Sequence, residues 1–265
     1  MGLDKLLALA IEATLDAGKE IMRIYESDDF GVSFKDDDSP LTKADTAANE
    51  IICTLLSTVN YPILSEEGKH LPYDERKKWK TLWIVDPIDG TKEFIKKNGE
   101  FTVNIALVEN QLPILGVIFI PAKGELYYAT KNGGAFKAIG IDTRASIEHI
   151  VASSLKLPLG MRSNLYTIIA SRSHPSQEVE AFIKKMRQEK GEIDLVSRGS
   201  SLKFCLVAEG SADCYPRFAP TMEWDTAAGQ AICNAVGIDV IDIGTSENMK
   251  YNRQNLLNNS FVVQK

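Results

Sequence analysis

The sequence has few cysteines and histidines and no long uninterrupted apolar run. Its 265 residues include four cysteines and three histidines. No two cysteines have the CxxC spacing of a zinc or redox motif, so we expect reduced, mostly buried thiols. No stretch approaches the ~20 apolar residues of a membrane span, and the charged, amphipathic N-terminus does not resemble a signal peptide. We expect a cytoplasmic protein without a transmembrane segment; peripheral association with the inner membrane stays open.

The chain also lacks an excess of positive charge. It has 30 Lys and Arg against 36 Asp and Glu, for a formal net charge of −6. Because a nucleic-acid polymer is bound through clustered positive charge, we expect no such partner. Hydrophobic residues make up 44% of the chain and charged residues 25%, which is typical of a soluble globular protein. These quantities leave the oligomeric state open.

Hydrophobic periodicity predicts both helices and strands. Apolar residues recur at helical spacing over 3–24 and 48–59, with Ser39-Pro40 as the expected entry to the second helix. Residues 101–138 predict a β-meander, and strands and helices alternate after a connection at 142–164. We expect an α+β protein with helices layered on sheets. Residues 1–265 are predicted to form a single domain with two lobes, 1–150 for metal and catalysis and 151–265 for substrate.

The densest chemical signal is the segment WIVDPIDGTKEF, residues 83–94. A strand expected to end at Val85 would deliver Asp86 and Asp89 to one place, with Pro87 stiffening the turn between them. Gly90 allows a close approach of the backbone to a ligand, and the amides of Gly90 and Thr91 would open a helix suited to phosphate. Turn formation by the two aspartates and helix capping by Thr91 are the plainer alternative.

Three other acidic residues stand in similar contexts. Glu66 follows a short strand and is followed by Glu67; Asp225 begins an apolar helix; Asp45 lies in LTKAD. Capping or a solvated helix face would also explain the last two. Carboxylates suit Mg²⁺, and no His or Cys cluster competes for zinc. If the acids converge, bound metal would relieve their mutual repulsion, so the pattern predicts a magnesium site beside a phosphate cradle.

The segments WIVDPIDGTKEF and EWDTAAG resemble the two signature motifs of the inositol monophosphatase superfamily. The resemblance runs over nearly the whole chain. It implies the layered α/β sugar-phosphatase fold and a Mg²⁺-dependent, lithium-sensitive phosphatase that uses two or three metal ions. Carried over by position, the implied metal ligands are Glu66, Asp86, Asp89, Asp225 and the carbonyl of Ile88. Asp45 and Thr91 would activate the attacking water, with Glu66 also counted as catalytic and Glu67 as the weaker member of the glutamate pair.

Within the superfamily, the chain is most similar to the CysQ-type 3′(2′),5′-bisphosphate nucleotidases. The similarity lies in residues 89–107 and 113–117, in ASRSH at 170–174 and in GSSLKF at 199–204. It implies a small phosphorylated nucleotide as substrate. The implied substrate-binding residues are Gly90, Thr91, Ser171, His174, Gly199, Lys203 and Asp225. Loop capping by His174 and a solvated position for Lys203 are the alternatives, and Arg172, Arg198 and Arg217 are further unranked candidates for anion binding.

The function expected from this resemblance is hydrolysis of adenosine 3′,5′-bisphosphate (PAP) to AMP and phosphate. Its sulfated analogue PAPS is a second expected substrate, and the implied role is removal of a by-product of sulfate assimilation. Two alternatives stay open: an inositol or sugar phosphate monophosphatase with the same metal site, and a catalytically silent nucleotide-binding regulatory protein. The complete set of acids speaks against the second.

Overall fold

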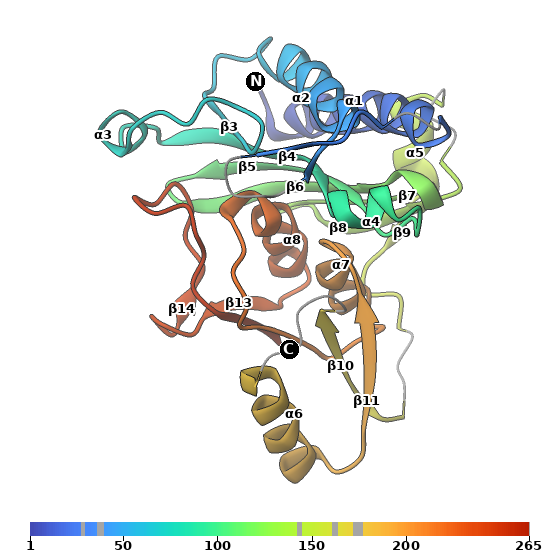
Figure 1. Cartoon of the computed structure of the whole chain (residues 1–265), viewed down its shortest axis with the longest axis vertical. Coiled ribbons are helices and arrows are strands. Elements are labelled where there is room, and N and C mark those ends of the chain that lie inside the picture. The colour runs from blue at the N-terminus through green and yellow to red at the C-terminus, as the bar shows by residue number, and fades with distance from the viewer. Residues whose placement is uncertain (28–29, 36–39, 142–144, 161–163, 172–176, 265) are drawn as a thin grey trace.

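The computed structural model describes residues 1–27, 30–35, 40–141, 145–160, 164–171 and 177–264. Helices and sheets alternate in five layers (Figure 1). The outer layer consists of α1 (Leu3–Tyr25) and α2 (Lys43–Leu56). Next come a large sheet, then α7 (Leu202–Glu209) and α8 (Glu223–Ala235), then a second sheet, and finally α6 (Gln177–Lys190). The layering of helices on sheets predicted from the sequence is confirmed.

The large sheet has seven strands in the order β3-β4-β5-β6-β7-β8-β9 within the described ranges. All neighbours are antiparallel except β3 and β4, which are parallel. Its strands are β3 (Ile63–Ser65), β4 (Thr81–Asp89), β5 (Thr102–Glu109), β6 (Leu112–Ile120), β7 (Glu125–Thr130), β8 (Gly134–Ile139) and β9 (Leu155–Lys156). The meander predicted for residues 101–138 is therefore present.

The second sheet has the order β11-β10-β12-β15-β13-β14. Its strands are β10 (Tyr166–Ser171), β11 (Ile193–Arg198), β12 (Cys214–Arg217), β13 (Asp239–Asp242), β14 (Glu247–Asn248) and β15 (Phe261–Gln264). The remaining elements are the hairpin strands β1 (Ser33–Phe34) and β2 (Pro40–Leu41), the helices α3 (Tyr73–Arg76), α4 (Thr91–Ile95) and α5 (Ile147–Ser153), and the 3₁₀ turn η1 (Pro121–Lys123).

Two large hydrophobic clusters hold the first four layers together, and a small third cluster packs α6 against the second sheet. One large cluster lies between α1, α2 and the large sheet; the other joins the opposite face of that sheet to α7, α8 and the second sheet. The approach of α8 to β6 is close because Gly116 has no side chain: a Cβ there would lie 2.4 Å from the carbonyl oxygen of Ala228. This contact packs α8 closely against the large sheet.

Three local predictions were wrong. The connection expected at 142–164 contains α5 and β9, and β9 is the edge strand of the large sheet. β4 does not stop at Val85 but continues to Asp89, and its pairing with β5 shifts register between Asp86 and Asp89. This irregularity accommodates Pro87, which cannot donate a ladder hydrogen bond. The second helix begins at Lys43 rather than at Ser39-Pro40, because Pro40 belongs to β2.

Candidate metal centre and substrate cleft

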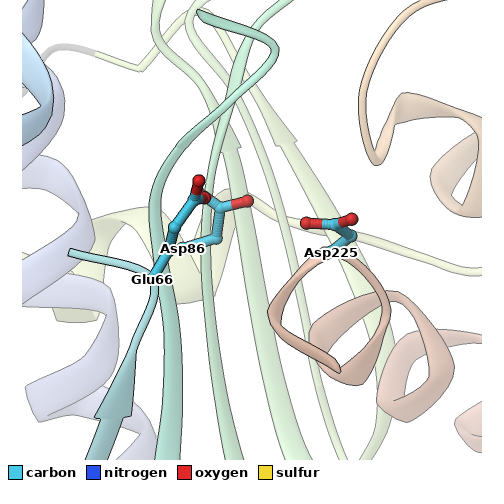
Figure 2. A group of neighbouring side chains, drawn as sticks. All are labelled: Glu66, Asp86 and Asp225. Carbon is cyan, nitrogen blue, oxygen red and sulfur yellow. The ribbon is translucent and has the colours of Figure 1, made fainter. Parts of the chain in front are cut away.

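Three carboxylates from separate segments meet at one point. Glu66 follows β3, Asp86 lies on β4 and Asp225 lies in the first turn of α8; one carboxylate oxygen from each lies within 4.8 Å of the others. Figure 2 shows the side chains of Glu66 and Asp86 side by side and Asp225 facing them from its helix. The convergence on which the predicted metal site depended is present for these three residues.

Local backbone geometry orients two of these acids. The amide of Ile88 donates to Asp86 Oδ1 at 3.0 Å, across Pro87. The amide of Met222 donates to Asp225 Oδ2 at 2.8 Å, so Asp225 caps its own helix as the plainer interpretation proposed. Asp86 Oδ2 is buried and has no hydrogen-bond partner among the described residues. Each acid thus has one oxygen held by the backbone and a second that is available to a ligand.

Electrostatics at the cluster are unfavourable without a cation. Burial raises the pKa of Asp86 well above its ordinary value, and the charges of Glu66, Asp89 and Asp225 raise it further. Burial, followed by Asp89 and Glu66, does the same to the pKa of Asp225. An unpartnered buried oxygen within an all-oxygen donor set fits a hard divalent cation such as Mg²⁺. The site therefore meets the chemical requirements of the metal that the sequence predicted.

Lys35 supplies a positive charge beside this cluster. Its Nζ donates to Glu66 Oε1 at 2.7 Å and also to Glu67. Burial alone would lower the pKa of Lys35, but the two glutamates raise it above its ordinary value. Lys35 was not predicted from the sequence, because nothing in the local pattern around it marks a charge partner 31 residues away. Lys35 also gives Glu67 a defined partner outside the three-acid group.

Asp89 stands apart from the three-acid group but borders the same space. Its Oδ2 accepts a hydrogen bond from Ser201 Oγ at 2.7 Å, and its side chain lines the cleft beside Glu66 and Asp225. Burial raises the pKa of Asp89, whereas Lys203 and the Ser201 hydrogen bond lower it. Ser201 is a second residue of the site that was not predicted from the sequence.

Thr91 and Asp45 contact each other at the edge of the cluster. Thr91 Oγ1 lies 3.2 Å from Asp45 Oδ1 and 3.3 Å from the carbonyl oxygen of Ile88, so its single proton can go to either. Asp45 Oδ2 accepts hydrogen bonds from the Thr42 amide and hydroxyl in the capping box of α2. Burial raises the pKa of Asp45, while the Thr42 bonds lower it. The predicted pairing of these two side chains is observed.

A cleft of about 300 Å³ extends from the acids to the second sheet. Its walls include the following predicted residues: Glu66, Asp89, Gly90, Thr91, Gly199, Lys203 and Asp225. Gly90 has φ of 93°, which favours glycine, and a Cβ there would lie 3.2 Å from the carbonyl oxygen of Glu100. Glu66 and Asp89 make the cleft acidic on the side of the large sheet, and Asp225 adds a carboxylate from α8.

The opposite side of the cleft is basic. Lys203 is buried. Its ammonium group donates a hydrogen bond to the carbonyl oxygen of Ser200 and lies 5.4 Å from the centre of the Tyr215 ring. Burial lowers the pKa of Lys203 to about 8, opposed by Asp89. Arg217 and Tyr215 also line the cleft. A solvated position for Lys203 is thus ruled out, and an anion on this side of the cleft would meet Lys203 and Arg217.

The side chains of two predicted substrate-binding residues lie outside the described part of the structure. Ser171 ends β10, beside Arg198 of β11, but its side chain lies outside the described residues. His174 lies entirely outside them. Both stay predictions.

Comparison with known proteins agrees with this geometry. The model of the inositol monophosphatase family matches residues 2–265. The chain belongs to the inositol monophosphatase family. Its match to this family confirms the resemblance in the motifs at residues 83–94 and 223–229 and confirms the predicted fold.

Relatives of this family member include proteins named CysQ. The 3′(2′),5′-bisphosphate nucleotidase CysQ of Salmonella typhimurium is 41% identical over 252 residues, covering 94% of this chain and 95% of that protein. The enzyme of the same name from Escherichia coli K12 is 42% identical over 230 residues, covering 86% of each. The crystal structure of CysQ from Bacteroides thetaiotaomicron has a TM-score of 0.91 and 49% identity, covering 99% of this chain and 97% of that one. No helix in the described part of this family member is both long and apolar enough to cross a membrane.

Proposed function

We propose that this protein is a Mg²⁺-dependent phosphomonoesterase that hydrolyses the 3′-phosphate of PAP to give AMP and phosphate, and that PAPS is also a substrate. The observation that carries the proposal is the cleft with acids on one wall and cations on the other. A bisphosphate nucleotide has one phosphate for each side: one to be cleaved beside the carboxylates and one to be held by positive charge. The names of the relatives support the same substrate class.

The acid side is proposed to hold the metal. Glu66, Asp86, Asp89, Asp225 and the carbonyl oxygen of Ile88 are the proposed ligands, shared among two or three ions. Bound Mg²⁺ supplies positive charge that stabilises the phosphoryl oxygens and makes a nearby water more acidic. Asp86 Oδ2, buried without a partner in the described residues, gives the physical reason for a cation at this point.

Thr91 and Asp45 are proposed to handle the proton of the attacking water. When Thr91 Oγ1 donates to Asp45 Oδ1, the lone pairs of Oγ1 are free to accept a hydrogen bond from that water. Asp45 has its other oxygen occupied by Thr42, so its carboxylate is held in place while it receives the threonine proton. Glu66, at the edge of the same space, is the other acidic residue that we propose to be catalytic.

The basic side is proposed to bind the second phosphate. Lys203 offers a point charge, Gly199 lines the cleft at the turn before α7, and Gly90 with Thr91 presents amides to the phosphate that is released. Ser171 and His174 are proposed to complete the nucleotide site. Loss of Lys203 should therefore affect binding of a bisphosphate more than of a monophosphate.

A comparison of two substrates tests the proposal. The purified protein is assayed with PAP and with inositol 1-phosphate at saturating Mg²⁺, and kcat/KM is measured for each by phosphate release. We expect PAP to be preferred and EDTA to remove activity on both. Preference for inositol 1-phosphate would assign the protein to the inositol monophosphatases proper, and absence of phosphate release from either would favour the catalytically silent alternative.

A further inference from the structure

The hydroxyl of Ser201 lies at the junction of three elements of the cleft. Ser201 is the N-cap residue of α7, and its side chain is buried. Its Oγ lies 2.7 Å from Asp89 Oδ2 at the end of β4 and 2.9 Å from the backbone carbonyl oxygen of Asp225 on α8. It also accepts a hydrogen bond of 3.0 Å from Asn104 Nδ2 on β5. This single oxygen therefore contacts segments up to 112 residues away in sequence.

The chemistry of the neighbours determines how these bonds are shared. A serine hydroxyl has one proton and two lone pairs. The Asp89 carboxylate is the stronger acceptor because it carries charge, so the proton goes to Asp89 rather than to the Asp225 carbonyl. Asn104 must then present its amide nitrogen to the lone pairs of Oγ, which is the observed orientation. Asn104 thus directs the hydroxyl, and the hydroxyl holds one oxygen of Asp89.

We infer that Ser201 is a positioning residue for the metal centre: its hydroxyl, oriented by Asn104, holds Asp89 Oδ2 so that Oδ1 faces the carboxylate cluster. The inference rests on the proposed function, because it takes Asp89 as a metal ligand. Ser201 is not a catalytic residue in this account, since it acts only through Asp89. Residues that orient ligands in this way typically change metal affinity by 10–100-fold when removed.

The backbone around Ser201 is held independently of Asp89. The amide of Gly199 donates to Glu100 Oε2 at 2.9 Å, and the next residue, Ser200, has φ of 44°. Removing the Ser201 hydroxyl therefore leaves the turn before α7 tied to the loop that precedes β5. Ser201→Ala is therefore expected to release Asp89 Oδ2 and to leave Asn104 Nδ2 without this acceptor, while the backbone before α7 stays in place.

Divalent-cation binding tests the inference separately from activity. Mn²⁺, a paramagnetic stand-in for Mg²⁺, is titrated into the metal-free protein without nucleotide, and free Mn²⁺ is followed by electron paramagnetic resonance. We expect Ser201→Ala to raise the Kd for Mn²⁺ about tenfold. The matched control is Ser211→Ala, just beyond the other end of α7, where Oγ also donates to a carboxylate, Glu209 Oε1, at 2.7 Å. Its Kd should equal that of the wild type.

A second variant tests the orienting role of the asparagine. Asn104→Ala removes the donor to the lone pairs of Ser201 Oγ, so the hydroxyl is held less firmly on Asp89 and the Kd for Mn²⁺ should rise, but by less than in Ser201→Ala. In the double variant, the Kd should be no higher than in Ser201→Ala alone, because the asparagine acts through the serine. If Ser201→Ala does not fold, a raised Kd in Asn104→Ala supports the inference and an unchanged Kd overturns it.

The outcomes separate this inference from the proposed function. A Kd for Ser201→Ala within twofold of wild type, in a protein that hydrolyses PAP, overturns the positioning role alone. A Kd raised to the same extent in Ser211→Ala would likewise overturn it, since the effect would then be one of general stability. A wild-type protein that binds Mn²⁺ but releases no phosphate refutes the proposed function and leaves the positioning role standing.

Discussion

Replacing one buried acid should make the metal-free protein more stable and its metal centre inactive. Asp86 is buried among Glu66, Asp89 and Asp225, and its Oδ2 has no hydrogen-bond partner in the described ranges. In Asp86→Asn the amide oxygen can still accept from Ile88, as Oδ1 does at 3.0 Å, while the new NH₂ faces neighbouring carboxylates as a donor. The substitution removes repulsion and a metal ligand together.

The size of the gain follows from the spacing of the acids. One carboxylate oxygen from each of the three acids lies within 4.8 Å of the others. Two unit charges at that distance repel by about 3.5 kcal/mol at an effective dielectric constant of 20. Protonation already relieves part of this in the wild type, so we expect a gain in the free energy of unfolding of about 1–2 kcal/mol. For a chain of this size that corresponds to a rise in Tm of about 4 °C.

The gain should also depend on pH. The folded-state pKa of Asp86 is raised above its ordinary value, so well below the ordinary value the carboxyl is protonated in both the folded and unfolded states. There the substitution changes little. As pH rises above about 4, the unfolded state ionises first and the wild type loses stability that Asp86→Asn does not lose. The difference in Tm should therefore grow between pH 5 and pH 8.

Thermal denaturation in EDTA and in Mg²⁺ checks these expectations. Wild type should gain Tm on addition of Mg²⁺, whereas Asp86→Asn should start higher in EDTA and gain little. Asp242→Asn is the matched control, because Asp242 is also buried but accepts hydrogen bonds from Gly244 at 2.7 Å and Asn259 at 2.9 Å. It should lose about 1–2 kcal/mol and keep its Mg²⁺ response. An Asp86→Asn variant less stable than wild type in EDTA would refute the reasoning.

Three further predictions concern catalysis and binding. Thr91→Val keeps the shape of the side chain but removes the proton path to Asp45, so kcat should fall 10²–10⁴-fold with unchanged Mg²⁺ affinity; an unchanged kcat would exclude the proposed role. Asp89→Asn should nearly abolish PAP hydrolysis without changing the circular dichroism spectrum, and retention of more than a tenth of the activity would contradict its role as a ligand. Because burial lowers the pKa of Lys203 to about 8, its charge is present below that pH and lost above it, so KM for PAP should rise from pH 7 to pH 9.5. Lys203→Arg should flatten this profile, and Lys203→Ala should raise KM more for PAP than for 3′-AMP; a flat wild-type profile or equal losses would count against it.

The site residues that lie within continuous sequence motifs could be predicted from the sequence. Asp86, Asp89 and Thr91 lie within one continuous motif, and Asp225 begins a helix whose apolar pattern is clear, so their types and contexts pointed to the chemistry. The helix layers and the meander followed from periodicities of 3.6 and 2. Where β4 ends was misjudged because Pro87 suggests a strand terminus, whereas the register shift in the pairing with β5 accommodates it.

Contacts between distant segments were beyond such reasoning. Lys35 meets Glu66 across 31 residues, and Ser201 meets Asn104 across 97. Neither serine nor asparagine has a sequence signature for orienting a carboxylate, because the role depends on where β5 and α7 lie in three dimensions. Such a network is found only from the packed structure.

A crystal of the protein grown with AMP, phosphate and Mg²⁺ tests the central claim most directly. We predict electron density for Mg²⁺ coordinated by carboxylate oxygens of Glu66, Asp86 and Asp225, with phosphate on the acid side of the cleft and the 5′-phosphate of AMP at Lys203. Mg²⁺ and phosphate bound elsewhere, with the three carboxylates uncoordinated at saturating Mg²⁺, would contradict the account.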